Sequence, residues 1–315
     1  MNAVRLSRRA FISALGVGAV AACAAATQEA ASPQGAPSDA DLAARKQAAA
    51  APNPIGVTQL SFQRRFAEGL KVTDFPRLVK SQVGVSLVSW CGPLMGETGA
   101  QAVAALRGAM DDAGVRTVLV DPGLGPGLAS ADGVERARIV ERLKPWFEVV
   151  RGLSGAGVSL DLRGEGDMDA QRAGALEGLR LALPALKAAG LQGVVKCLGG
   201  YTSHGQFLAA LMQGVNDASI RLEPTFDGWR VSQTEEYHRI RGTELLMPYA
   251  ACVLADCAEF KPDGEPVNVP TRYLVQRIRA GGFRGPAMMQ FKGAGDELEG
   301  TLKIKKLLMR YPFRP

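Results

Sequence analysis

Histidine is scarce in this chain, which has only His204 and His238 among its 315 residues. Structural and catalytic zinc sites usually take one or more imidazole ligands, and these two histidines are far apart in the sequence. A histidine-rich metal site and a two-histidine metal motif are therefore excluded. We interpret His204, which follows Gly200–Ser203, as the cap of a helix start rather than as a catalytic base.

No strong excess of one charge is present either. The 37 Lys and Arg against 31 Asp and Glu give a net charge of +6, and aromatic residues make up only 6%. Three of the positive charges, Arg5, Arg8 and Arg9, lie at the extreme N-terminus, so the rest of the chain carries +3. Without a basic cluster interleaved with aromatics, nucleic-acid binding is not expected. The hydrophobic content of 47% is sufficient for a sizeable core.

No hydrophobic run is long enough to span a bilayer, since the apolar segment near the N-terminus ends at about Ala22. Residues Ser7–Ile12 (SRRAFI) resemble a twin-arginine export motif, and Val20–Cys23 resembles a lipobox. We predict a signal peptide over 1–22, acylation of Cys23 and a periplasmic protein anchored in the membrane by its lipid. Ordinary signal-peptidase cleavage after Ala24–Ala26 is the alternative.

The segment 23–54 is rich in Ala, Pro, Gln and Ser. Such a composition buries little apolar surface, so we predict a flexible tether. Beyond Cys23 four cysteines remain. Cys252 and Cys257 lie on or just past one predicted strand. In an extended chain, five steps of ~3.3 Å separate them by roughly 16 Å, whereas a disulfide needs about 6 Å between α-carbons. We expect free thiols unless the chain turns after Ala255.

From residue 55 onward, short runs rich in Val, Leu and Ile alternate with segments of helical period. This alternation predicts an α/β fold with a parallel sheet. Eight strands and eight helices over about 260 residues match a (β/α)8 TIM barrel, which we place at 55–315. The predicted strands are Val57–Phe62, Val85–Trp90, Thr117–Asp121, Val158–Leu162, Gly193–Cys197, Ser219–Glu223, Ala251–Ala255 and Ala287–Phe291. The predicted helices are 74–82, 101–112, 132–152, 169–188, 203–213, 233–248, 270–280 and 296–310.

Chemistry in such a barrel lies at the carboxyl ends of the strands, and this rule selects the candidate site. Asp121 ends the third predicted strand. As catalytic candidates the same rule selects Lys196, Glu223, Asp227 and Asp161. As substrate-binding candidates it selects Trp90, Arg163, Thr225, Trp229, Asp256, Gln290 and Lys292. The alternative is that the charged groups pair as salt bridges and merely close the barrel.

The sequence resembles the xylose-isomerase-like TIM barrels, a family that includes sugar-phosphate isomerases and epimerases, dehydratases and apurinic endonucleases. The resemblance extends over most of the barrel. It rests on the order and spacing of several short segments, which include Thr73–Arg77, Lys144–Trp146, Gly199–Gly200, Pro248–Ala250, Gly282–Gly285 and Gly295–Gly300.

The resemblance implies a divalent metal held by Glu, Asp, His and Glu on strands five to eight. Here those positions hold Lys196, Thr225, a residue at or near Leu254, and Gln290. We therefore predict no metal at this centre and no other cofactor. A buried Lys196 ammonium needs a partner, and the nearest candidates by fold position are Glu223, Asp227 and Asp256.

Three hypotheses follow for function. The barrel is a metal-independent sugar isomerase, epimerase or lyase, with Lys196 as acid, base or nucleophile and Asp161, Glu223 or Asp227 transferring protons. Alternatively it is a pseudoenzyme that binds a small carbohydrate or a partner protein, with Trp90 and Trp229 as stacking faces. In the third hypothesis the barrel is structural. The oligomeric state stays open, and the run Gly123–Gly127 is interpreted as a flexible loop because it lacks the dinucleotide-binding spacing.

Overall fold

The computed structural model describes residues 53–313. The predicted signal peptide, the predicted acylation site at Cys23 and nearly all of the predicted tether lie outside the described residues. Within residues 53–313, no helix combines the length and the apolar character that a membrane crossing requires.

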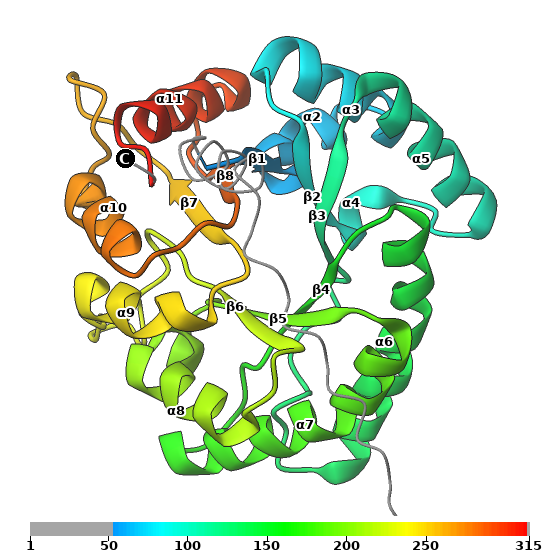
Figure 1. Ribbon diagram of the computed structural model, residues 1–315, viewed down its shortest axis with the longest axis vertical. Coiled ribbons are helices and arrows are strands. Elements are labelled where there is room, and N and C mark those ends of the chain that lie inside the picture. The colour runs from blue at the N-terminus through cyan, green and yellow to red at the C-terminus, as the bar shows by residue number, and fades with distance from the viewer. Residues whose placement is uncertain (1–52, 314–315) are drawn as a thin grey trace, which may run out of the picture. The chain divides into compact units, whose positions relative to one another are not determined.

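Eight parallel strands form one sheet that curls into a barrel (Figure 1), in the order β6-β5-β4-β3-β2-β1-β8-β7. This confirms the predicted (β/α)8 architecture. The strands are β1 (Ile55–Thr58), β2 (Leu87–Cys91), β3 (Arg116–Asp121), β4 (Gly157–Leu160), β5 (Gln192–Lys196), β6 (Ile220–Glu223), β7 (Val253–Cys257) and β8 (Ala287–Phe291).

The two ends of this order, β6 and β7, meet through isolated parallel bridges rather than through a ladder. The bridges join Leu222 to Ala250 and Thr225 to Leu254. The N–H of Leu254 donates to the carbonyl of Pro224 at 2.8 Å, and the N–H of Phe226 donates to the carbonyl of Leu254 at 2.9 Å. We call this junction the β6–β7 seam.

Helices surround the sheet in Figure 1, and at least one helix separates each strand from the next. Each of the two histidines is the N-cap residue directly before a helix. The Nδ1 atoms of His204 and His238 accept the N–H groups of Phe207 and Arg241, each at 3.3 Å, which confirms the predicted cap at His204. The helices are α2 (Gln63–Ala67), α3 (Phe75–Leu78), α4 (Gly92–Met95), α5 (Ala100–Ala113), α6 (Gly133–Gly152), α7 (Met168–Ala189), α8 (Gly205–Val215), α9 (Arg239–Leu246), α10 (Thr271–Ala280) and α11 (Glu297–Arg310).

The first predicted strand was too long, because β1 ends at Thr58 and a 3-10 turn, η1 (Gln59–Phe62), follows it. Side-chain hydrogen bonds hold this turn. The Oε1 atom of Gln59 accepts the N–H of Cys91 at 2.9 Å, and its Nε2 atom donates to the carbonyl of Leu94 at 3.0 Å. The turn is thereby fixed to β2 and to α4, where periodicity alone indicated more strand.

The predicted helix 233–248 was also too long, because α9 begins only at Arg239. The preceding segment folds back on itself. An antiparallel bridge joins Arg230 to Glu236, and the N–H of Tyr237 donates to the carbonyl of Trp229 at 2.8 Å. These bonds occupy backbone groups that a longer helix would need.

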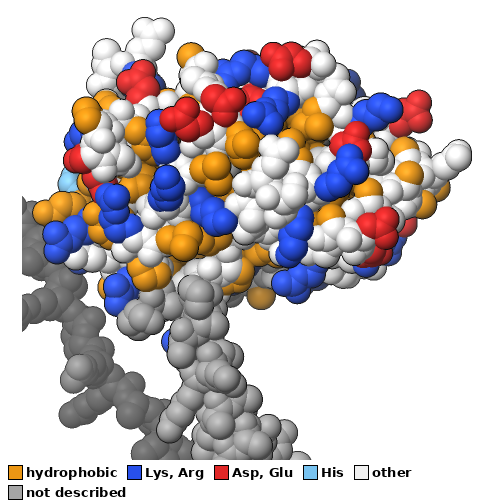
Figure 2. Space-filling view, turned by 90° about the horizontal axis from the view of Figure 1, so that it is seen from above, with side chains coloured by type: hydrophobic (Ala, Val, Ile, Leu, Met, Phe, Trp, Pro, Cys, Tyr) orange, Lys and Arg blue, Asp and Glu red, His pale blue; other side chains and the backbone are white. Residues whose placement is uncertain are grey.

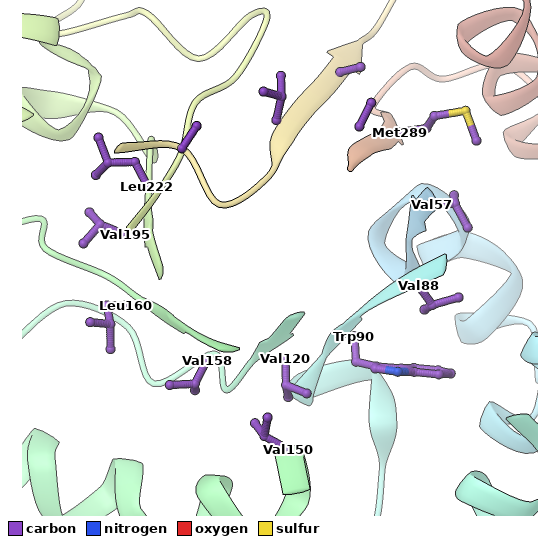
Figure 3. Packing of buried hydrophobic residues seen from close by; sticks show 14 of the residues in the cluster. Val57, Val88, Trp90, Val120, Val150, Val158, Leu160, Val195, Leu222 and Met289 are labelled. Carbon is purple, nitrogen blue, oxygen red and sulfur yellow. The ribbon is translucent and has the colours of Figure 1, made fainter. Parts of the chain in front are cut away.

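Alternate residues of each strand face opposite sides of the barrel wall. On β7, Val253, Ala255 and Cys257 belong to the large hydrophobic core between sheet and helices, part of which is shown in Figure 3. Cys252 and Leu254 instead form a small separate cluster with Met288. The next inward position on β7 is therefore Asp256, at the carboxyl end of the barrel. On the face shown in Figure 2, basic and acidic side chains are interspersed with hydrophobic ones.

Candidate functional site

The central group at the carboxyl ends of the strands is Lys196, the last residue of β5. Its Nζ atom donates to Oδ2 of Asp121, the last residue of β3, at 2.9 Å, and only 11% of the lysine side chain is exposed. Burial opposes the positive charge, but the charges of Asp121 and Glu223 and the hydrogen bond that Lys196 donates to Asp121 outweigh it. The pKa of Lys196 therefore lies above its ordinary value.

The hydrogen-bonded partner of Lys196 is thus not one of the three residues that we expected. Glu223 contributes only its charge, while Asp227 and Asp256 pair with another lysine. Asp121 ended a predicted strand, but nothing in the sequence showed that its carboxylate reaches Lys196, two strands further along the sheet.

Glu223, the last residue of β6, is 2% exposed. The thiol of Cys252 donates to its Oε1 atom at 3.4 Å. Burial raises the pKa of the Glu223 carboxyl above its ordinary value, although the charge of Lys196 and the thiol hydrogen bond act against this rise. Glu223 is therefore a buried carboxyl with a raised pKa, close to a lysine whose pKa is also raised.

A second network lies at the β6–β7 seam. The Nζ atom of Lys292 donates to Oδ2 of Asp256 at 2.7 Å and to Oδ2 of Asp227 at 3.1 Å. The other oxygen of Asp256 accepts from the hydroxyl of Thr225 and from the N–H groups of Phe226 (3.0 Å) and Asp227 (2.9 Å). One carboxylate of β7 therefore holds the segment that follows β6, and Lys292 balances its charge.

Two further predicted residues form a pair of their own. The guanidinium of Arg163 donates to both carboxylate oxygens of Asp161, at 3.0 Å and 2.6 Å for the closest contacts. Gln290 lies beside Asp256 in the register of β7 and β8. The ion pairs predicted as the alternative to catalysis are thus present at Lys196, Arg163 and Lys292.

Trp90 and Trp229 do not provide the stacking faces that we expected, because they are 1% and 0% exposed. Trp90 makes an edge contact with Phe75 of α3, and its indole N–H donates to the hydroxyl of Thr117 at 3.0 Å. The indole N–H of Trp229 donates to the carbonyl of Thr225 at 2.9 Å. Both rings are satisfied core residues, and Figure 3 shows Trp90 among the other apolar side chains.

Two hollows open at this end of the barrel. One, of about 310 Å³, is lined by residues that include Glu223, Asp256, Gln290 and Lys292, and we call it the polar hollow. The other, of about 300 Å³, lies over β3 and β4 beside α6 and contains Asp121, Asp161 and Arg163. Both include Leu60, Lys196 and Leu198. Sequence reasoning missed Leu60 and Leu198, which carry no chemical signal of their own.

The four cysteines of the described residues are free thiols. Burial is the largest cause of a raised pKa in all four: about 11 for Cys91, about 12 for Cys197 and Cys257, and well above the ordinary value for Cys252. These thiols are weak nucleophiles at neutral pH, so the site offers no cysteine for covalent chemistry. Within residues 53–313, no group of three or more His, Cys, Asp or Glu side chains is placed to hold a metal ion.

Comparison with known proteins finds similar chains only among solved structures, since no family model and no curated protein match the sequence. The 3-keto-D-glucoside 4-epimerase of E. coli is 12% identical with a TM-score of 0.63, covering 82% of this chain and 99% of that one. A sugar phosphate isomerase/epimerase from Parabacteroides distasonis is 14% identical (TM-score 0.64, 84% and 96% covered). A xylose isomerase-like TIM barrel protein from Mycobacterium smegmatis in complex with magnesium is 15% identical (TM-score 0.60, 82% and 96% covered). The chain therefore has the xylose-isomerase-like TIM barrel fold of solved sugar epimerases and isomerases.

Proposed function

We propose that this barrel binds a small carbohydrate at the carboxyl ends of its strands, without a metal ion. The observation that carries the proposal is the paired set of charges around Lys196 and Lys292, which lines a hollow of about 310 Å³. Paired ammonium and carboxylate groups offer donors and acceptors for sugar hydroxyls at fixed positions, and the volume lies at the lower end of ligand sites. The solved neighbours named as sugar epimerases and isomerases support the choice of ligand class.

The residues present do not fit the divalent metal that the fold family implies. At the positions that the resemblance assigns to metal ligands stand Lys196, Thr225, Leu254 and Gln290. The carboxylates nearby are engaged, Asp121 by Lys196 and Asp256 by Lys292. A divalent cation here would lie against two ammonium groups and would lack the carboxylate and imidazole ligands of such centres.

Isothermal titration with a panel of mono- and disaccharides tests the proposal. We expect at least one sugar to bind, Lys196→Met to abolish or strongly weaken that binding, and the matched surface variant Lys187→Met to leave it unchanged. Lys187 is 52% exposed and pairs with Asp217 away from both hollows. Chelator treatment should not alter the affinity. No binding by any sugar would refute the proposal, and stoichiometric zinc or manganese in the purified protein, lost in Gln290→Ala, would refute its metal-free part.

Catalysis on the bound sugar is the second candidate, and one observation favours it. The buried Glu223 carboxyl, whose pKa is raised, lines the polar hollow and has the properties of a general acid. Lys196 is a poorer candidate for base or nucleophile, because it would have to lose a proton that Asp121 and Glu223 hold in place. NMR of each bound sugar over hours distinguishes the candidates: new resonances that Glu223→Gln abolishes indicate turnover, and unchanged spectra indicate binding alone.

We further propose that the protein acts on the periplasmic side after export, held by a lipid on Cys23. The support is the order of the two N-terminal motifs in the sequence. Incorporation of labelled fatty acid into the wild type but not into Cys23→Ser tests the anchor, and label-free protein released by ordinary cleavage would refute it.

A further inference from the structure

Three hydroxyl groups on strands of the barrel have no hydrogen-bond partner among residues 53–313. They belong to Thr58, Ser89 and Ser159, and their oxygen atoms are buried. The exposed fractions of the three residues are 6%, 6% and 5%. Buried polar groups in native proteins are nearly always hydrogen-bonded, because an unpaired buried donor or acceptor destabilises the fold. These hydroxyls therefore require a partner other than a protein group.

The three hydroxyl-bearing residues border one small cavity in the barrel. Thr58, the last residue of β1, is the register neighbour of Ser89 on β2, which in turn neighbours Leu119 on β3. Ser159 lies on the next strand, β4. All four residues line the same space. The fold thus gathers around one cavity three hydroxyls that the sequence keeps far apart.

The rest of the cavity wall carries charges of both signs. Lys196 and Glu223, which are register neighbours at the ends of β5 and β6, line it together with Asp121. The ammonium of Lys196 disfavours a bound cation, and the carboxylate of Asp121 disfavours a bound anion. A neutral molecule that both donates and accepts hydrogen bonds suits such a wall.

The size of the cavity limits the choice of that molecule. A buried water needs roughly 10–15 Å³ and two to four polar partners. Here a space of about 10 Å³ is bordered by the three hydroxyls. No sugar or other organic ligand fits into so small a volume.

We propose that one water molecule is bound inside the barrel by the hydroxyls of Thr58, Ser89 and Ser159 and by the ammonium of Lys196. An ammonium has three N–H donors, and the bond to Asp121 uses one of them. Lys196 also lines the polar hollow, so the water links the interior hydroxyls to the charged groups of the candidate site. This inference does not depend on sugar binding.

A high-resolution crystal structure of the protein tests the site directly. We expect one solvent peak about 2.5–3.2 Å from at least two of the three hydroxyl oxygens and from Nζ of Lys196. A dry cavity would overturn the proposal, and so would a metal ion identified there by its anomalous scattering.

Substitutions that remove only a hydroxyl test the site in solution. Thr58→Val keeps the shape of the side chain, and Ser159→Ala removes one oxygen atom. If each hydroxyl binds the water, each variant loses a hydrogen bond and should melt about 2–4 °C below the wild type. If the hydroxyls are unpartnered, their removal should instead leave the melting temperature unchanged or raise it. The control Thr234→Val, at an exposed threonine outside the cavity, should melt like the wild type.

The double variant shows whether the two hydroxyls share one partner. Thr58 and Ser159 lie on β1 and β4, which are not neighbours in the sheet. Independent losses at such sites add. With a shared water, the double variant should lose clearly less than the sum of the two single losses, because the first substitution already weakens the binding of the water. Additive losses, or a melting temperature that either single variant does not lower, would refute the proposal.

Discussion

Removal of the negative charge of Asp121 gives the sharpest test of the site's electrostatics. In Asp121→Asn the shape of the side chain is kept, but the ammonium of Lys196, only 11% exposed, loses the carboxylate at 2.9 Å. Breaking a buried ion pair by removing one partner costs about 3–5 kcal/mol. Because Asp121 is 26% exposed and Glu223 also stabilises the charge, we expect a smaller loss, about 2–3 kcal/mol in the free energy of unfolding.

Urea unfolding at pH 7 measures this loss, and a double-mutant cycle assigns it to the pair. Asp121→Asn combined with Lys196→Met should recover most of the stability, because no uncompensated charge then remains buried. The matched control Glu141→Gln breaks an exposed pair with Lys144, whose side chains are 67% and 48% exposed, and should cost less than about 1 kcal/mol. A loss in Asp121→Asn no larger than in the control, or no recovery in the double variant, would refute the reasoning.

Raising the pH should also remove the stabilisation that the Lys196–Asp121 ion pair gives the folded protein. Since the pKa of Lys196 is raised in the folded protein, the unfolded chain loses this proton first as the pH rises. The stabilisation is therefore complete below about pH 10 and is lost as the pH rises further towards the folded pKa. From pH 9 to 11 the wild type should lose more stability than Lys196→Met, and parallel curves would contradict the assignment.

Three further predictions follow from the structure. Since the pKa of Glu223 is raised in the folded state, the wild type should become less stable relative to Glu223→Gln as the pH rises from 4 to 7, and urea midpoints across that range should show a widening difference. Gly178→Ala should lower the free energy of unfolding by about 1–3 kcal/mol, because the new Cβ would lie closer to the carbonyl oxygen of Leu128 than van der Waals contact allows. The control Gly108→Ala, also in a helix, places its Cβ in open space and should raise the free energy of unfolding by about 0.5–1 kcal/mol. Equal melting temperatures of the two variants would contradict both expectations. Iodoacetamide at pH 8 should modify the four thiols of the described residues slowly in the native state and rapidly after denaturation, because their pKa values are raised; rapid native alkylation seen by mass spectrometry would refute this.

The sequence allowed the barrel to be predicted because its signal is local and repeated. Strand β8 coincides with its predicted bounds, Ala287–Phe291, since a short apolar run there is flanked by Gly and Pro on one side and by Lys and Gly on the other. Strand β1 was overextended because buried hydrogen bonds of Gln59 turn the chain. These bonds reach residues about 30 positions further along the chain, and the hydrophobic periodicity of residues 57–62 contains no information about them.

The candidate site was predicted only as a set of positions. The rule that chemistry lies at strand ends selected Lys196, Asp121 and Lys292. Which carboxylate pairs with which ammonium depends on the distances between side chains of different strands, and the sequence does not give these distances. Trp90 was misplaced for a related reason. Strands of a parallel barrel are buried on both faces, so the alternation that would show Trp90 facing the helices is hidden among apolar neighbours.

The β6–β7 seam makes the closure of this barrel dependent on a side chain. Where other neighbouring strands share a ladder, β6 and β7 have isolated bridges, and the carboxylate of Asp256 supplies three more bonds across the gap. The same carboxylate holds Lys292 beside the polar hollow. A ligand that drew Lys292 away would thus leave the buried carboxylate of Asp256 without its ion-pair partner, and a ligand that bound both Lys292 and Asp256 would stabilise the β6–β7 seam. The amide groups of Phe226 and Leu254 donate hydrogen bonds across this seam. Their hydrogen-exchange rates should therefore change when a ligand binds, because binding alters how often the seam opens.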